Sequence, residues 1–352
     1  MEFALSDEQR MIAETAHGFF AENATSERTR KAMSATGIDT ALWHAFCRDL
    51  GLSGIGIAET AGGAGLGLVE LALVAEAAGA HVAALPLLGS LALCAQAIAA
   101  GGTAEQQQAL LPALLSGETI AGYVHDPALR ADGNVLTGES RFVTHGAAAA
   151  VLVVTSNTGA WIVHTDAPGV TIAAQTTMDQ TRPLARVTLT GAAATPLADP
   201  VAAIARAHAT GFVVLAAEAL GGAQATLDRT VAYAKERVQF GRPIGSFQAY
   251  KHRLADMMIE IEQARSAVWW AACAVDEGAA DADLAIHAAK SFCADTFHMC
   301  AGNMIQLHGG IGFTWEHDAH LYFKRARAIL SALGTGAWHR EQVAARILGD
   351  AA

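Results

Sequence analysis

Residues 233–248 read YAKERVQFGRPIGSFQ, and this stretch separates two long segments with helical periodicity. The first segment is an amphipathic run, and Ser246 can cap the helix that follows a turn at Gly241 and Pro243. Arg237 lies in the last turn of the first helix, where its guanidinium can bind a diphosphate through paired hydrogen bonds. Taken alone, however, the pattern favours a simpler interpretation, in which Arg237 complements the dipole at a helix C-terminus.

Working outward from this stretch, we divide the chain into three parts. The C-terminal part has the pattern of helices, predicted over about 201–240, 246–277 and 281–307. The middle part holds short β-favouring runs at 151–154, 161–163 and 186–189, which predict a small antiparallel β domain. The N-terminal part is helical and opens on a predicted capping box of Ser6 and Gln9. We therefore expect a mostly α protein with a small central β domain, divided into residues 1–118, 119–200 and 201–352.

Composition narrows the range of functions. The 352 residues are 52% hydrophobic and carry a net charge of −11, which disfavours a nucleic-acid partner because such a partner requires a basic face. The five cysteines form no CxxC pair, so we expect neither a disulfide framework nor a zinc site, and a reducing cytoplasm fits. The acidic N-terminal residues do not predict a signal peptide. The uncharged stretch 83–100 reads as a buried helix rather than a membrane span.

A second motif lies downstream, where residues 306–316 read QLHGGIGFTWE. Its glycines allow close approach of a ligand to the backbone. The two motifs, in this order and at this spacing, resemble the signatures of the FAD-dependent acyl-CoA dehydrogenases. The resemblance covers nearly the whole chain and includes residues 54–63, although Ala58 stands where the family usually has a proline.

The resemblance implies a fold and a cofactor. The fold is an N-terminal helical domain, a β domain and a C-terminal four-helix bundle, usually assembled as dimers of dimers. The cofactor is FAD, the substrate is an acyl-CoA, and the expected electron acceptor is an electron-transfer flavoprotein. In such an assembly the C-terminal motifs contact FAD that is held mainly by a neighbouring subunit. The implied FAD-binding residues are Arg237, Gln239, Phe240, Ile244, Gln306, Gly309, Gly310 and Thr335.

The catalytic base of the family has no counterpart at the expected positions. Most members place a glutamate in a Glu-Gly-Thr segment, and the matching residue here is Leu333. Other members place it near the start of the helix that leads into the arginine motif, where this chain has Gly211. Glu218 lies on the same side of that helix, but about 10.5 Å further along the axis. It is a weak candidate base, and a structural carboxylate with a partner is the simpler interpretation.

The segments that hold the flavin ring in the family also differ here. The family's Thr-Glu-Pro and its glycine-rich loop correspond to a His125–Pro127 segment, followed by what looks like a shortened loop. Phe142 replaces the usual tryptophan before Thr144. The cluster of possible metal ligands at 316–320 is more simply a solvated or interface turn, so we expect no metal.

Three interpretations remain open at this point. The leading one is a subunit of a heteromeric acyl-CoA dehydrogenase, in which a longer partner subunit carries the base. Such enzymes are known among bacterial enzymes that shorten steroid side chains, and the length of this chain is similar to theirs. The first alternative is a self-sufficient homo-oligomer that uses Glu218 or another base. The second is a scaffold subunit without FAD, although a scaffold has no need of the arginine motif.

Overall fold

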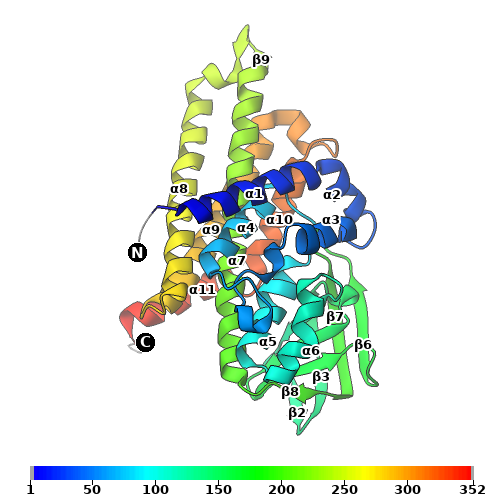
Figure 1. The fold of residues 1–352 in the computed structure, drawn as a ribbon. Helices are drawn as coiled ribbons and strands as arrows, with labels where there is room; N and C mark the ends of the chain where they lie inside the picture. The colour runs from blue at the N-terminus through cyan, green and yellow to red at the C-terminus, as the bar shows by residue number, and fades with distance from the viewer. Residues whose placement is uncertain (1–3, 350–352) are drawn as a thin grey trace. The chain divides into compact units, whose positions relative to one another are not determined.

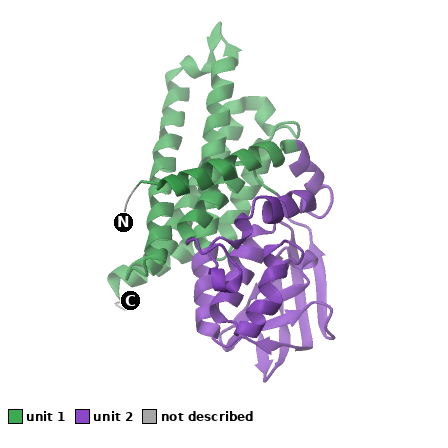
Figure 2. Cartoon of the chain, in the orientation of Figure 1, with its two compact units in different colours: residues 1–26, 68–83, 212–352 green, residues 27–67, 84–211 purple. Residues whose placement is uncertain are grey.

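The computed structural model describes residues 4–349, which fall into two compact units. The first unit comprises residues 1–26, 68–83 and 212–352, and the second comprises 27–67 and 84–211 (Figure 2). The longest helix, α7 (Pro200–Glu236), runs through the boundary between Gly211 and Phe212.

The first unit is helical. Its elements besides α7 are α1 (Asp7–Asn23), α4 (Leu68–Ala80), β9 (Val238–Gln239), β10 (Arg242–Pro243), η6 (Ile244–Ser246), α8 (Gln248–Asp276), α9 (Ala282–His308), η7 (Gly309–Phe313), α10 (Ala319–Ser331) and α11 (Gly336–Leu348). Helices α8, α10 and α11 all pack on α9, and α1 packs on α4. The capping box of Ser6 and Gln9 is confirmed at the start of α1.

Small residues allow helices of this unit to approach closely. A Cβ atom added at Gly221 of α7 would lie 1.9 Å from the carbonyl oxygen of Glu76 in α4, so the two backbones are in direct contact there. Ala216, Ala217 and Ala223 of the same helix are fully buried. The alanine-rich composition therefore forms closely packed helices rather than a loose surface.

The second unit combines short helices with the strands. Its helices are α2 (Ser26–Met33), α3 (Thr40–His44), η1 (Ala45–Asp49), η2 (Leu52–Gly54), η3 (Glu59–Ala61), η4 (Leu87–Ala95), α5 (Gln96–Gly101), α6 (Ala104–Leu115) and η5 (Gly146–Ala148). Its strands are β1 (Ala121–His125), β2 (Arg130–Asp132), β3 (Val135–Thr144), β4 (Val151–Ser156), β5 (Gly159–His164), β6 (Val170–Gln175), β7 (Leu184–Ala193) and β8 (Thr195–Pro196). The stretch 83–100 is largely the buried helices η4 and α5, as expected.

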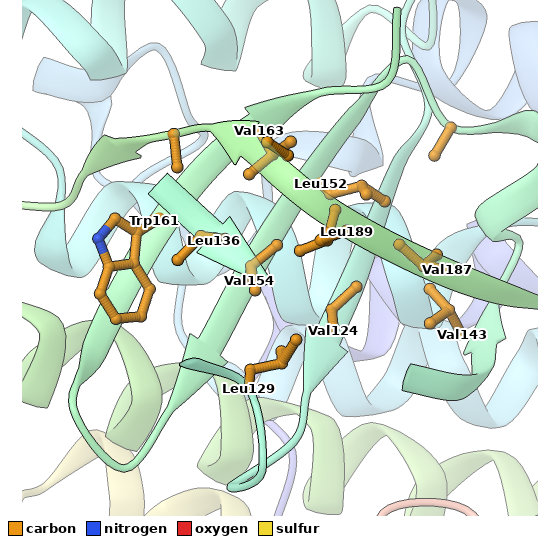
Figure 3. Packing of buried hydrophobic residues seen from close by; sticks show 13 residues of the cluster. Val124, Leu129, Leu136, Val143, Leu152, Val154, Trp161, Val163, Val187 and Leu189 are labelled. Carbon is orange, nitrogen blue, oxygen red and sulfur yellow. The ribbon is translucent and has the colours of Figure 1, made fainter. Parts of the chain in front are cut away.

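The strands form two four-stranded sheets, in the orders β1-β4-β5-β8 and β2-β3-β7-β6. Side chains of both sheets meet in one core, where Val124, Leu152 and Val154 of the first sheet lie with Leu136 and Leu189 of the second (Figure 3). The expected antiparallel pairing is wrong for one pair, because β1 runs parallel to β4 from Ala121–Val151 to His125–Thr155. A parallel pair needs a crossover, and the chain makes it by passing through β2 and β3 of the other sheet.

The predicted fold class is confirmed. The strands of the two sheets lie between Ala121 and Pro196, with helices before and after them (Figure 1). The boundaries at 118 and 200 stay a prediction. By length and composition α7 could cross a membrane, although more than half of its most apolar window is buried.

Candidate functional site

The first candidate group lies where α7 and α8 meet, at the end of the helical unit marked by β9 in Figure 1. Helix α7 ends at Glu236, and β9 and β10 form a two-residue ribbon before α8 begins. Arg237 is exposed, and its carbonyl oxygen accepts a hydrogen bond from the Ile244 amide at 2.8 Å. Gln239 is exposed as well. The guanidinium and the amide of these two residues are therefore accessible to a ligand.

Phe240 has an unusual conformation at the tip of this ribbon. Phe240 and Gly241 have φ angles of +53° and +75°, as the two central residues of a type I′ turn do. An asparagine or glycine normally occupies the first of these positions, because a bulky side chain is strained there. Phe240 is nevertheless 92% exposed. A strained and exposed aromatic residue favours a binding role over a packing role.

The second group lies at the C-terminal end of α9. Helix α9 ends at His308, and Gly309 has a φ of +65°, which a residue without a Cβ adopts easily. Nothing lies within 4 Å of the position of a Cβ at Gly309 or Gly310. Gln306 and both glycines are exposed. This segment therefore presents bare backbone beside a side-chain amide.

Contacts within the unit join these two groups. The Tyr250 hydroxyl, near the start of α8, donates to the Leu307 carbonyl oxygen at 3.0 Å. Tyr233, one turn before Arg237, stacks on His308 with the ring centroids 4.4 Å apart. The structure therefore places the arginine motif and the glycine motif at the same end of the helical unit.

Thr335 lies elsewhere in the unit. Its hydroxyl caps α11 by accepting from the Trp338 amide at 3.3 Å. The preceding residue, Gly334, accepts a hydrogen bond from Lys290 of α9 at 2.5 Å. Lys290 and Gln306 are 16 positions apart on one helix, which corresponds to about 24 Å. One copy of this chain therefore does not bring Thr335 together with the arginine and glycine motifs.

Leu333 occupies a left-handed turn before α11. It is half-buried and has a φ of +53°, which is rare for a leucine. At the neighbouring Gly334, with a φ of +108°, an added Cβ would lie 2.6 Å from the Trp338 ring. The backbone at Leu333 therefore has a conformation of the kind found at functional sites, although the Leu333 side chain is aliphatic.

A buried polar network supports this turn, and sequence reasoning did not single it out. The Nε2 of His339 lies 3.2 Å from the Leu333 carbonyl oxygen, and its Nδ1 lies 2.8 Å from the Nδ1 of His287. Because a carbonyl only accepts, Nε2 of His339 carries the proton, and the Nδ1 of His287 must then donate to His339. Lys290 completes the network at Gly334 and is fully buried.

Burial lowers the pKa of all three titratable groups in this network. Burial, the Lys290 cation and His287 together lower the pKa of His339 to about 3, against the opposing effect of its hydrogen bond to the Leu333 carbonyl oxygen. Burial and the Arg346 cation lower the pKa of His287 to about 4, against the opposing effect of Asp283. Burial also lowers the pKa of Lys290 to about 8, although Asp295 counteracts this. Both histidines are therefore uncharged at neutral pH.

Glu218 lies in the interior of the helical unit. It is 6% exposed and forms an ion pair with Arg325, which is 2% exposed and also contacts the Ala83 carbonyl oxygen. A buried carboxylate held by a guanidinium has a structural partner, and removal of either group would leave an uncompensated charge. This environment differs from that of an accessible proton acceptor.

The remaining candidate positions lie in the second unit. His125 ends β1, and its Nδ1 lies 2.9 Å from the Thr155 hydroxyl. Its ring also meets that of His208, one turn before Gly211 on α7, with the centroids 4.9 Å apart. Phe142 is exposed, with a φ of +67°, at a bulge where β3 changes register against β7. Strands often carry such bulges beside functional sites.

The side chains at 316–320 make other contacts. The Asp318 carboxylate accepts a hydrogen bond from the Ser26 hydroxyl at 2.5 Å and forms an ion pair with Arg229 at 3.4 Å. The Nδ1 of His317 accepts from the Ala319 amide at 3.1 Å. Within residues 4–349, no group of three or more His, Cys, Asp or Glu residues is arranged to hold a metal ion.

Comparisons with known proteins match the N-terminal and C-terminal parts of the chain to one family. The N-terminal domain of acyl-CoA dehydrogenases matches residues 6–118, and the C-terminal domain of the same family matches residues 202–348. The acyl-CoA dehydrogenase IpdE2 of Mycobacterium tuberculosis is 39% identical over 322 residues, which cover 91% of each chain.

Two solved structures are similar over nearly the whole chain. A variant of the Tcur3481-Tcur3483 steroid ACAD is 33% identical with a TM-score of 0.87, covering 97% of this chain and 98% of that one. One chain in the structure of the ChsE4-ChsE5 complex from Mycobacterium tuberculosis is 27% identical with a TM-score of 0.93, covering 100% of this chain and 100% of that one.

Proposed function

We propose that this chain, which belongs to the acyl-CoA dehydrogenase family, is the subunit without a catalytic base in a heteromeric enzyme. Enzymes of this family are FAD-dependent oxidoreductases that introduce an α,β double bond into an acyl-CoA thioester. The cofactor is therefore FAD. The finer assignment to one kind of subunit is argued below from the residues.

The donors and the open backbone of the helical unit suit FAD. Arg237 offers a planar fork for a diphosphate, and the bare backbone at Gly309 and Gly310 leaves room for close approach. The exposed ring of Phe240 can pack on a ribose or on a base. We therefore infer that Arg237, Gln239, Phe240 and Ile244 bind the diphosphate side, that Gln306, Gly309 and Gly310 bind the adenine side, and that Thr335 contributes its hydroxyl.

The observation that carries the proposal is the leucine at the position of the base. When bound, FAD supplies the hydride acceptor, so a protein group must take the proton from the α carbon. The side chain of Leu333 has no lone pair to accept a proton, and the carboxylate of Glu218 is engaged in an ion pair with Arg325. We infer that the longer partner subunit provides the carboxylate.

Two further features support an enzyme whose FAD is shared between subunits. The arginine and glycine motifs are separated from Thr335 by about 24 Å along α9, so the two groups would serve different FAD molecules. Large apolar side chains near the motifs are exposed and suited to being covered, namely Val238, Phe240, Ile311, Phe313 and Trp315.

The relatives suggest the rest of the proposal. One is a steroid ACAD, and one is a complex of two named chains. By analogy we propose a cytoplasmic heterotetramer that acts on a steroid side-chain acyl-CoA and passes electrons to an electron-transfer flavoprotein. This chain has no role in binding nucleic acid in this proposal.

Co-expression tests the assembly directly. Expressed alone, the chain should be colourless or poorly soluble, because its exposed aromatic surface has no cover. Co-expression with a longer acyl-CoA dehydrogenase encoded beside it should give a yellow complex on gel filtration. A yellow and active preparation of this chain alone would contradict the proposal.

One observation favours the self-sufficient alternative. The Thr155 hydroxyl has one proton and lies 3.1 Å from the Val124 carbonyl oxygen, which only accepts. If that proton is donated to Val124, the Nδ1 of His125 must donate to Thr155, and Nε2 keeps a lone pair. Burial lowers the pKa of His125, against the opposing effect of Asp126, which favours the neutral form of the ring. Substitution of His125 therefore belongs in any test for a base within this chain.

A further inference from the structure

Three rings lie in a row beside the arginine and glycine motifs. Tyr233 of α7 stacks on His308 at the end of α9, with the centroids 4.4 Å apart and the planes at 21°. His308 in turn faces His317, which precedes α10, at 4.5 Å and 48°. We call these three residues the ring column.

Backbone hydrogen bonds fix the two imidazoles of the ring column. The Nδ1 of His308 lies 2.7 Å from the Met304 carbonyl oxygen, and because a carbonyl only accepts, this nitrogen carries the proton. The Nδ1 of His317 accepts from the Ala319 amide at 3.1 Å, so its proton lies on Nε2 when the ring is neutral. Neither ring can turn without losing its backbone bond.

The ring column joins the segments that carry the two motifs. Tyr233 lies one helical turn before Arg237, and His308 immediately precedes Gly309. Asp318, next to His317, pairs with Arg229 of α7 at 3.4 Å and adds a second link between these segments. Packed rings, together with the hydrogen bond from Tyr250 to Leu307, therefore link the arginine motif to the glycine motif.

We propose that the ring column is a positioning device that holds the two FAD-contact segments at the spacing FAD requires. Tyr233 and His308 act through Arg237 and Gly310 and do not touch FAD themselves. The inference rests on the proposed function, because it assumes that both segments contact one FAD. A ligand held at two separate segments binds more tightly when those segments are ordered before it arrives.

The test compares variants that keep a ring with variants that remove it. In the assembled complex, Tyr233→Leu and His308→Leu keep apolar volume but lose the flat face, whereas Tyr233→Phe keeps the face. Phe19→Ala is the matched control, because Phe19 is a half-buried aromatic residue that pairs with Phe20 at 5.2 Å and belongs to neither motif. The FAD-free complex is titrated with FAD, and its melting temperature is measured with and without FAD.

We expect the leucine variants to bind FAD roughly tenfold more weakly, as the loss of aromatic pairing at each site suggests. In the leucine variants, adding FAD should also raise the melting temperature by less than it does in the wild type. Tyr233→Phe and Phe19→Ala should keep the wild-type Kd and the wild-type rise. If His308→Leu fails to assemble, the comparison of Tyr233→Leu with Tyr233→Phe decides alone.

A purely structural ring column would give a different result. The leucine variants would then melt at a lower temperature but bind FAD with the wild-type Kd, and the inference would be overturned. A wild-type complex that binds no FAD would instead contradict the proposed function. The two failures are therefore distinguishable.

Discussion

Arg237 is the residue on which FAD binding by this chain should depend most. It is exposed, and among the cationic side chains of residues 233–248 it is the one best placed to bind a diphosphate. Loss of a charge-assisted hydrogen bond costs about 1.5–3 kcal/mol. We therefore predict that Arg237→Ala in the assembled enzyme weakens FAD binding by roughly ten- to a hundredfold. Flavin absorbance per protein after gel filtration measures this.

Arg327→Ala is a suitable control for that prediction, because Arg327 is an exposed arginine of α10 outside both motifs. It should keep the wild-type flavin content. Unchanged flavin content in Arg237→Ala would remove Arg237 from the cofactor site.

The proposed binding role of Phe240 implies that its turn trades stability for binding. Asparagine is favoured at the first central position of a type I′ turn, so Phe240→Asn should ease the strained backbone. We predict an unchanged or higher melting temperature of the FAD-free complex, together with lower flavin content. If Phe240→Asn keeps the wild-type flavin content, the exposed ring of Phe240 does not contact FAD in the enzyme.

The contact between α9 and α11 makes stability depend on pH. His287 and His339 are neutral in the folded protein, with pKa values of about 4 and about 3, whereas the unfolded chain binds these protons below pH 6.5. The unfolded state thus holds more protons between about pH 6.5 and 4, so the stability of the fold falls as pH falls through this window. Above pH 6.5 this contribution is complete.

Replacing both histidines with glutamine tests the origin of this effect. Glutamine can donate and accept but does not titrate, so the double variant should lose less stability between pH 7 and pH 5 than the wild type does. Urea unfolding at the two pH values measures the difference. Equal losses in both proteins would assign the acid sensitivity to other groups.

The elements that sequence reasoning predicted well are those with local signals. The periodicity of 201–240 predicted α7, and the β-favouring runs at 151–154 and 161–163 correspond to β4 and β5. Partnerships between distant residues left no such signal. Arg325 lies 107 positions from Glu218, and His339 lies 52 positions from His287, so neither pair could be read from local pattern. The parallel pairing of β1 with β4 likewise depends on a crossover rather than on the strands themselves.

At the scale of the whole molecule, the proposal requires this chain to contribute FAD contacts without contributing a base. Restoring a carboxylate should therefore matter only where a flavin ring already lies nearby. We predict that Leu333→Glu leaves the isolated chain inactive. Glu218→Gln should lower the melting temperature, because Arg325 loses its buried partner, while turnover per bound flavin stays near the wild-type value.

The most direct test is acyl-CoA-dependent reduction of an artificial electron acceptor by the assembled complex, normalised to bound flavin. Because a general base contributes about 10²–10⁴-fold, removal of the glutamate from the longer subunit should abolish turnover with FAD still bound. Glu218→Gln and His125→Gln in this chain should remain near the wild-type rate. A fall of about a hundredfold or more in either variant, with flavin content and assembly unchanged, would place the base in this chain and contradict the account.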